Sequence, residues 1–220
     1  MPKRTVLLLG ATGLVGGYLL DGLLNAEFCG RVVTLTRSAI KNVEAAAKLD
    51  SRLVDFERPE KWRDQVAADL VLCAMGTTMK KAGSREAFRR VDFDYPLTAA
   101  QAARNQGCRH FLLVSAMGAN PGARLFYNRV KGELEAAILT LEFDSVSIFR
   151  PSLLLGNRPE FRLGEALGQV LGRRTSYLIP KRYRPIHAST VAKAMLRIAE
   201  QDPMGNRILT SADIAGLAGV

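Results

Sequence analysis

Three side chains in this sequence have the types and spacing needed for proton transfer to a carbonyl group. Ser115 follows an apolar run, Tyr127 comes twelve residues later, and Lys131 follows Tyr127 by four. An ammonium beside a phenol favours the phenolate and brings its titration toward neutral pH, which suits a general acid/base. The hydroxyl of Ser115 would hydrogen-bond the carbonyl oxygen that Tyr127 protonates. The ammonium of Lys131 would also hold the ribose of a nicotinamide cofactor.

These side chains need a strand and a helix that present them to the same place. Residues 110–115 have the apolar pattern of a buried strand that Ser115 closes. Residues 124–141 have a helical pattern, and two residues four positions apart share one face of a helix. A Tyr and a Lys at this spacing are common by chance. Combined with a Ser at a strand end and the glycine-rich turn described next, they favour a catalytic site over a surface coincidence.

The glycine-rich turn lies close to the N-terminus. An apolar strand at residues 6–9 ends at Gly10, Gly13 and Gly16 follow at three-residue intervals, and an apolar helical pattern begins at Leu14. Gly10 permits the turn, Gly13 lets the backbone approach phosphates, and Gly16 lets the helix pack closely on the strand. Unpaired N–H groups at a helix N-terminus carry partial positive charge, so the turn predicts a pyrophosphate site.

The end of the second predicted strand, residues 31–36, indicates which dinucleotide is bound. An acid at this position binds the 2′-hydroxyl of NAD, whereas an arginine accommodates the 2′-phosphate of NADP. There is no acid between Glu27 and Glu44, and the strand ends in Arg37-Ser38. A guanidinium is a permanent cation with a planar fork suited to phosphate, and Ser38 adds a hydroxyl donor. The sequence therefore favours NADP(H) over NAD(H).

Two later strand ends are expected beside the same cofactor. Asp55-Phe56, after the third strand, would lie beside the adenine ring. The segment Ala74-Met75-Gly76-Thr77, after the fourth strand, would lie near the ribose and phosphates. For Met75, filling the core is an equally good interpretation.

Apolar or β-branched runs alternate with helical patterns along the chain. We predict strands at residues 6–9, 31–36, 51–55, 69–74, 110–115, 145–149 and an edge strand at 208–209. Helical patterns start at residue 14 and occupy 44–48, 62–66, 84–105, 124–141, 164–171 and 189–201. We expect a bend or break near Pro96 in the helix at 84–105, and Ser189 as the cap of the helix at 189–201. Such alternation predicts an α/β protein with the Rossmann fold, a doubly wound parallel sheet with helices on both faces.

The composition is typical of one globular domain. The chain has 220 residues, of which 48% are hydrophobic, which is enough for a single domain at 1–220 with a large core. No apolar run approaches the ~20 residues that a membrane helix needs, and the apolar run at the start is too short for a signal peptide. Cys29, Cys73 and Cys108 are odd in number and lack metal-ligand spacing. We therefore expect reduced thiols, no metal site, no membrane association and a cytoplasmic location.

The charge is strongly basic, with a formal net charge of +10. The positive residues are spread along the chain, with denser places at 80–90 and 173–184. A solvated basic surface with some attraction for a phosphorylated cofactor explains this pattern better than a nucleic-acid partner, which we do not expect.

The motifs described above resemble those of a known superfamily. Gly10-x-x-Gly13-x-x-Gly16, Ser115 and Tyr127-x-x-x-Lys131 resemble, in order and spacing, the short-chain dehydrogenases/reductases. The glycine spacing and Arg150-Pro151 are similar to the extended and atypical branches. Residues 73–78 (CAMGTT) and 127–133 (YNRVKGE) look most like the small atypical NADPH-binding proteins related to the Tat-interacting-protein oxidoreductases.

The resemblance covers residues 5 to about 200 and implies more than the residues show by themselves. It implies a Rossmann domain with a small C-terminal substrate lobe at roughly 151–190, and a monomer or homodimer. It also implies further cofactor contacts, from Thr12, Leu14, Val15, Leu154 and Arg162. Many reductases of the superfamily carry an Asn in the fourth helix that supports a proton relay. Here the local options are Asp92 and Asn105, and the sequence does not clearly put either in that position.

These observations predict an NADP(H)-dependent oxidoreductase that acts on a small-molecule carbonyl or alcohol. The alternative is a non-catalytic NADPH-binding regulator or redox sensor. The presence of Ser115, Tyr127 and Lys131 together favours the enzyme, because a sensor has no need of the two hydroxyl groups. The identity of the substrate is not predicted.

Overall fold

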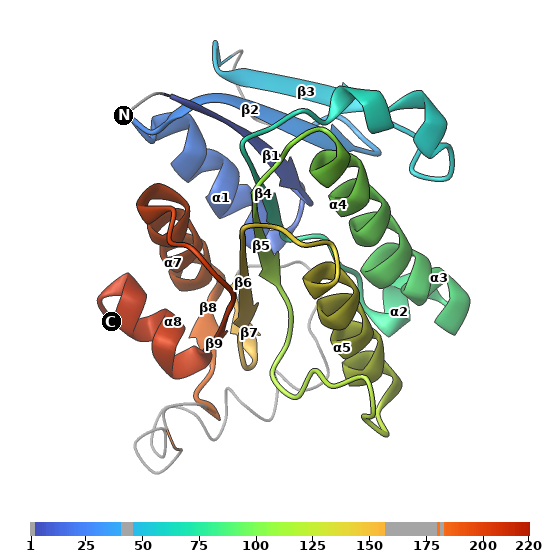
Figure 1. The fold of residues 1–220 in the computed structure, drawn as a ribbon. Helices are drawn as coiled ribbons and strands as arrows, with labels where there is room; N and C mark the ends of the chain where they lie inside the picture. Colours follow the sequence, from blue (N-terminus) through green and yellow to red (C-terminus); the bar gives the residue numbers. More distant parts are fainter. Residues whose placement is uncertain (1–2, 41–45, 157–179, 181–182) are drawn as a thin grey trace.

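The centre of the molecule is a seven-stranded parallel sheet (Figure 1). The computed structural model describes residues 3–40, 46–156, 180 and 183–220. The strand order is β3-β2-β1-β4-β5-β6-β9. The strands are β1 (Arg4–Leu9), β2 (Cys29–Thr36), β3 (Leu49–Leu53), β4 (Leu70–Cys73), β5 (His110–Val114), β6 (Ser145–Arg150) and β9 (Arg207–Thr210). The predicted parallel sheet and its edge strand near 208–209 are therefore confirmed.

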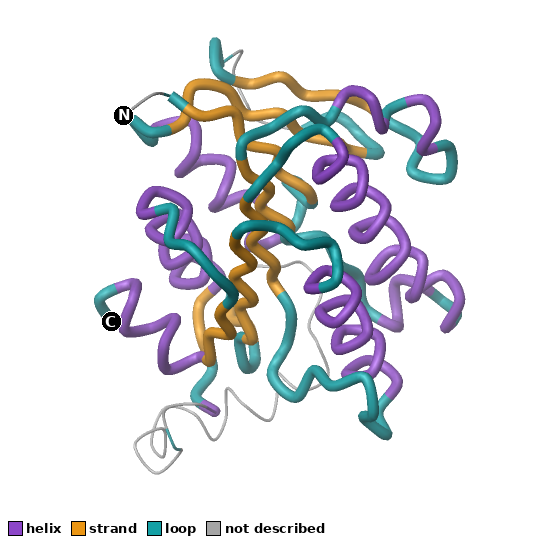
Figure 2. Tube along the Cα trace, viewed as in Figure 1, coloured by secondary structure: helices purple, strands orange, loops and turns teal. Residues whose placement is uncertain are grey.

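Helices cover both faces of this sheet (Figure 2). They are α1 (Leu14–Asn25), α2 (Met79–Ala82), α3 (Arg85–Arg89), α4 (Tyr95–Asn105), α5 (Phe126–Leu139), α7 (Ala188–Gln201) and α8 (Ser211–Ala218). A π-helical turn, η3 (Arg90–Asp94), joins α3 to α4, and η1 (Pro59–Lys61) and η2 (Arg63–Gln65) are short 3₁₀ turns. A two-stranded parallel pair joins β7 (Leu154–Leu155) to β8 (Ile186–His187). Among the described residues, no helix is both long and apolar enough to cross a membrane.

Strand β1 shows how the sheet is held between two cores. Successive side chains of a strand point to opposite faces. Val6 and Leu8 pack in one cluster with apolar residues of α1, α7 and α8, whereas Leu7 and Leu9 pack in the other with α4 and α5. All four are fully buried, which explains why the strand reads as a continuous apolar run.

The strand order reverses at β1, whose neighbours are β2 on one side and β4 on the other. In an open parallel sheet, ligands bind beyond the carboxyl ends of the strands at this reversal. The glycine-rich turn after β1 and the segment after β4 meet there.

The long helix predicted at 84–105 is interrupted, but upstream of Pro96. Helices α3 and α4 are joined by the π-helical turn η3, and Pro96 lies in the first turn of α4. Since α3, η3 and α4 follow one another without a break in the helical backbone, Pro96 lies inside a continuous helix, where a proline lacks an N–H donor and its ring crowds the preceding turn. The π-helical turn directly before Pro96 is the kind of interruption that such a proline leads us to expect.

Several other predicted boundaries were wrong. Strand β3 lies at 49–53 instead of 51–55, because its pairing with β2 ends at Leu53 opposite Thr36. Of the helix predicted at 44–48, residues 44–45 lie outside the described residues and 46–48 are not helical, with a turn at 47–48. The expected helix at 62–66 is replaced by 3₁₀ turns. Helix α7 starts at Ala188 after His187, so Ser189 is not its cap. The predicted helix at 164–171 and most of the predicted lobe at 151–190 lie outside the described residues.

Candidate active site

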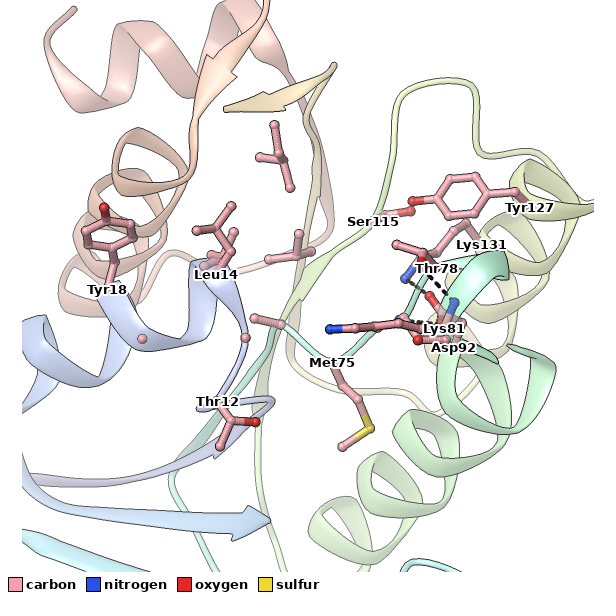
Figure 3. Close-up of a pocket in the computed structure, with 18 of the residues that line it drawn as sticks. Thr12, Leu14, Tyr18, Met75, Thr78, Lys81, Asp92, Ser115, Tyr127 and Lys131 are labelled. Atoms are coloured by element: carbon pink, nitrogen blue, oxygen red, sulfur yellow. Dashed lines mark hydrogen bonds and ion pairs between the residues drawn. The ribbon is translucent and has the colours of Figure 1, made fainter. Parts of the chain in front are cut away.

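A cavity of about 680 Å³ lies at the carboxyl ends of β1, β4 and β5 (Figure 3). In Figure 3, Leu14 and Tyr18 of α1 stand on one wall. Ser115, Tyr127 and Lys131 stand on the opposite wall. The cavity is lined by Thr12, Gly13, Leu14, Val15, Gly17, Tyr18, Asp21, Arg37, Ala74, Met75, Gly76, Thr77, Thr78, Lys81, Asp92, Val114, Ser115, Tyr127, Lys131 and Leu154.

The turn after β1 depends on glycine at two positions for different reasons. Gly10 has a φ of +84°, and a Cβ there would lie 2.7 Å from the backbone of Ala74. A Cβ at Gly16 would lie 1.9 Å from the carbonyl oxygen of Gly10, so α1 packs directly on the turn. Helix α1 begins after Gly13, and neither a capping side chain nor an acid lies at its first turn. The N–H groups of that turn therefore suit an anion such as a pyrophosphate.

Ser115 and Tyr127 reach the cavity from different elements. The N–H of Ser115 donates to the carbonyl oxygen of Phe149 at 2.7 Å, which extends the sheet by one residue beyond β5. Tyr127 lies in the first turn of α5, and its ring packs against Phe88 at 5.6 Å between centroids. The two hydroxyl groups point toward one another in Figure 3. The Ser115 hydroxyl oxygen is buried and has no hydrogen-bond partner within the described part of the chain.

Lys131 is buried, and an acid neutralises it. Its Nζ lies 2.8 Å from Oδ1 of Asp92, and the side chains are 5% and 1% exposed. Burial alone would lower the pKa of Lys131, but the charge of the Asp92 carboxylate and its hydrogen bond to the ammonium raise that pKa above its ordinary value. Burial also raises the pKa of the neighbouring Cys73 thiol to about 11, so that thiol is neutral at physiological pH. The Lys131 ammonium is thus a stable positive charge inside the cavity.

A smaller cavity of about 90 Å³ continues from the first toward β2. Phe56 and Tyr95 line it, and their rings stack with centroids 5.2 Å apart. Burial and the neighbouring Glu57, which accepts a hydrogen bond from the phenol, raise the pKa of Tyr95 to about 12. Of the described residues that line this cavity, only Arg37 is charged. Arg37 lines the larger cavity as well, so a flat ring and an anionic group would both find suitable contacts here.

The structure brings most of the predicted site residues together. The larger cavity is lined by Thr12, Gly13, Leu14, Val15, Arg37, Ala74, Met75, Gly76, Thr77, Ser115, Tyr127, Lys131 and Leu154. Gly10 and Phe56 line the smaller one. Gly16 lies behind the turn that it packs against. Ser38 and Asp55 are exposed and line neither cavity, and Asp55 forms a 3.6 Å ion pair with Arg58. Arg162 lies outside the described residues.

Sequence reasoning missed several residues that line these cavities. They are Gly17, Tyr18, Asp21, Leu35, Thr36, Thr78, Lys81, Val91, Tyr95 and Val114, together with Asp92, which was only an option for the relay position. Tyr18 and Asp21 follow Leu14 by four and seven residues, so helical spacing alone marks them as neighbours on the same face. Lys81 carried no such signal, because a lysine in a basic run usually lies on a solvated surface.

Comparison with known proteins identifies the family of this chain. A family model described as NAD(P)H-binding matches residues 10–142. Protein HTATIP2 of Rattus norvegicus is 38% identical over 171 residues, which are 77% of this chain and 70% of that protein. Protein FMP52, mitochondrial, of Candida albicans is 35% identical over 201 residues, which are 88% of this chain and 87% of that protein.

Solved structures support the fold. MoeE5 in complex with UDP-glucose and NAD superposes with a TM-score of 0.71 at 16% identity, over 98% of this chain and 81% of that one. A UDP-N-acetylglucosamine 4-epimerase from Methanobrevibacter ruminantium M1 gives 0.70 at 17% identity, over 96% and 77%. These similarities identify a Rossmann fold and no particular substrate. From the family match and the relatives above 30% identity, the chain belongs to the NAD(P)H-binding family of atypical short-chain dehydrogenases/reductases.

Proposed function

We propose that the protein is an NADP(H)-dependent oxidoreductase that exchanges a hydride between NADPH and a small-molecule carbonyl or alcohol, with Tyr127 as acid/base. One observation carries the proposal: a single cavity is lined by the glycine-rich turn, by Arg37 and by the three side chains Ser115, Tyr127 and Lys131. A dinucleotide and a carbonyl group can therefore occupy adjacent parts of one cavity.

The preference for NADP(H) rests on charge. Arg37 is the residue after β2 and lines both cavities. No acid stands between Glu27 and Glu44 to accept hydrogen bonds from a ribose 2′-hydroxyl. An arginine at this position gains a charge-assisted contact with a 2′-phosphate that NADH lacks.

The chain's own residues supply the proton in the proposed reaction. Ser115 has a buried hydroxyl without a partner in the described structure, and this hydroxyl would donate to the substrate oxygen. In reduction, the phenol of Tyr127 gives its proton to that oxygen, and in oxidation it takes the proton back. The buried, charged Lys131 stabilises the phenolate that remains. When bound, the reduced nicotinamide supplies the hydride.

Two variants test the proposal. Tyr127→Phe removes the transferable proton and keeps the ring, so it should bind NADPH as the unmodified protein does while losing at least about 100-fold in kcat. The measurement is loss of absorbance at 340 nm with a panel of aldehydes, ketones and quinones, beside fluorescence titration with NADPH. Tyr18→Phe is a matched control, because Tyr18 lines the same cavity on the opposite wall. Unchanged turnover in Tyr127→Phe would refute the acid/base role.

Tight NADPH binding without turnover on any substrate would favour the alternative, a non-catalytic regulator or redox sensor. The cytoplasmic location, the monomeric or dimeric state, the small lobe at 151–190 and the absence of a nucleic-acid partner stay predictions. The fungal relative FMP52 is named as a mitochondrial protein.

A further inference from the structure

Asp92 occupies an unusual position in the backbone. It is the central residue of the π-helical turn η3, between α3 and α4, and it is fully buried. A π-helical turn is rare and is often found at a functional site, because its wider spacing turns a side chain in a direction that a regular α-helix does not allow. A buried acid in such a turn therefore needs an explanation.

The two oxygens of Asp92 contact two separate elements of the cavity wall. Oδ1 lies 2.8 Å from the ammonium of Lys131 on α5. Oδ2 accepts a hydrogen bond of 2.7 Å from the N–H of Thr77, in the segment after β4. One carboxylate thus connects three elements, namely η3, α5 and the segment after β4.

Gly76 leaves the space that this arrangement needs. A Cβ at Gly76 would lie 3.1 Å from Oδ1 of Asp92 and 3.4 Å from Nζ of Lys131. The residue after β4 that approaches the pair most closely therefore has no side chain, and the ion pair forms part of the cavity wall itself.

The charged groups around Lys131 leave Asp92 as its neutralising partner. Cys73 of β4 is a neutral thiol, and Tyr127 is the other titratable side chain of α5 beside the ammonium. Two further acids of α5 are engaged elsewhere: Glu133 pairs with Arg89 and Glu135 with Arg150. Across the cavity wall, Lys81 of α2 is another cation and supplies no negative charge. Within the described structure, Asp92 is thus the acid at ion-pair distance from Lys131.

We propose that Asp92 is a positioning residue, which keeps Lys131 charged and fixes it against the Thr77 backbone, so that the ammonium faces Tyr127 and the cofactor cleft in one arrangement. The inference rests on the proposed function for its catalytic consequence, but the arrangement of the pair is testable without turnover. Removal of the acid alone leaves a buried ammonium without a counter-charge, and such a group loses its proton far more easily.

The test follows the proton on Lys131 directly. The protein is labelled with [ε-¹³C]lysine, and the Lys131 signal, identified by its loss in Lys131→Met, is followed by NMR from pH 7 to 11. In the unmodified protein the midpoint of this signal should lie above pH 10.5, the ordinary pKa of lysine. In Asp92→Asn, which preserves shape and a hydrogen-bond acceptor, its midpoint should fall by at least about one pH unit.

Asp94→Asn is the matched control, since it makes the same substitution two residues away in the same turn and should leave the Lys131 signal unchanged. The proposal requires the Lys131 midpoint to fall when the carboxylate of Asp92 becomes an amide, so an unchanged midpoint in a folded Asp92→Asn protein would overturn it. If Asp92→Asn does not fold, titration of the unmodified protein decides: a Lys131 midpoint below that of ordinary lysine would overturn it as well.

Cofactor binding distinguishes the failure of this proposal from failure of the proposed function. Asp92→Asn should weaken NADPH binding about tenfold in fluorescence titrations, the loss expected for one disturbed charge-assisted contact. If the unmodified protein does not bind NADPH, the proposed function fails and the lysine titration still stands. If NADPH binds and Asp92→Asn changes neither its affinity nor the Lys131 midpoint, Asp92 is not a positioning residue.

Discussion

Gly16 and Gly17 are adjacent in α1, yet the structure predicts opposite effects for their replacement by alanine. Alanine favours a helix over glycine by about 1 kcal/mol, and this gain applies to both. At Gly17 nothing lies within 4 Å of the added Cβ, so the gain remains. At Gly16 the Cβ would lie 1.9 Å from the Gly10 carbonyl oxygen, where a carbon–oxygen contact needs about 3.3 Å.

The clash at Gly16 involves backbone, which cannot rotate away as a side chain can. Overpacking costs about 1–3 kcal/mol, and the upper end applies where backbone must move. Gly16→Ala should therefore lower the free energy of unfolding by about 2 kcal/mol, whereas Gly17→Ala should raise it by up to about 1 kcal/mol. The affinity for NADPH should fall in Gly16→Ala too, because relief of the clash displaces Gly10.

Equilibrium unfolding in urea measures both effects. The chain has one tryptophan, Trp62, and it is 1% exposed, so its fluorescence reports global unfolding. The transition midpoint should move to lower urea for Gly16→Ala and to equal or higher urea for Gly17→Ala, with similar slopes. Equal shifts for the two variants would refute the view that α1 packs on the turn through the missing side chain of Gly16.

Three other predictions concern separate parts of the molecule. Arg37→Gln should raise the Kd for NADPH at least about tenfold and change that for NADH little; an equal change would remove Arg37 from the 2′-phosphate role. Burial raises the pKa of Cys73 to about 11 and of Cys108 to about 12, so neither thiol should react with a disulfide reagent at pH 8 until urea unfolds the chain. Burial lowers the pKa of His110 despite its contact with Asp202. Below pH ~6.5 the unfolded chain therefore binds more protons than the folded chain, and the free energy of unfolding should decrease from pH 7 to pH 5. His110→Asn should make the free energy of unfolding depend less on pH between 7 and 5. An unchanged pH dependence would mean that groups other than His110 cause the loss of stability.

The sequence was informative wherever function depends on local chain geometry. The turn from Gly10 to Gly16 needs small residues at fixed spacing directly after an apolar strand, and Tyr127 and Lys131 need one helical face. Both patterns are contained in a few consecutive residues. The parallel sheet likewise follows from apolar runs that alternate with helical ones, because few topologies accommodate that order.

Boundaries and partners between distant segments could not be predicted in the same way. The end of β3 depends on where its pairing with β2 stops, opposite Thr36. Tyr95 joins Phe56 in the smaller cavity only because α4 packs beside the segment after β3. Tertiary packing sets these contacts, and the local sequence carries no trace of them.

Asp92 and Lys131 show most directly the difference between what the local sequence determines and what the tertiary structure decides. The sequence by itself determined the glycine-rich turn, the Ser–Tyr–Lys order and the arginine after β2, because each is a matter of residue type and short-range spacing. Only the tertiary structure decided that Asp92, 39 residues before Lys131, contacts its ammonium at 2.8 Å. A buried ion pair depends on burial and on the approach of two chain segments, and both exist only once the helices have packed on the sheet.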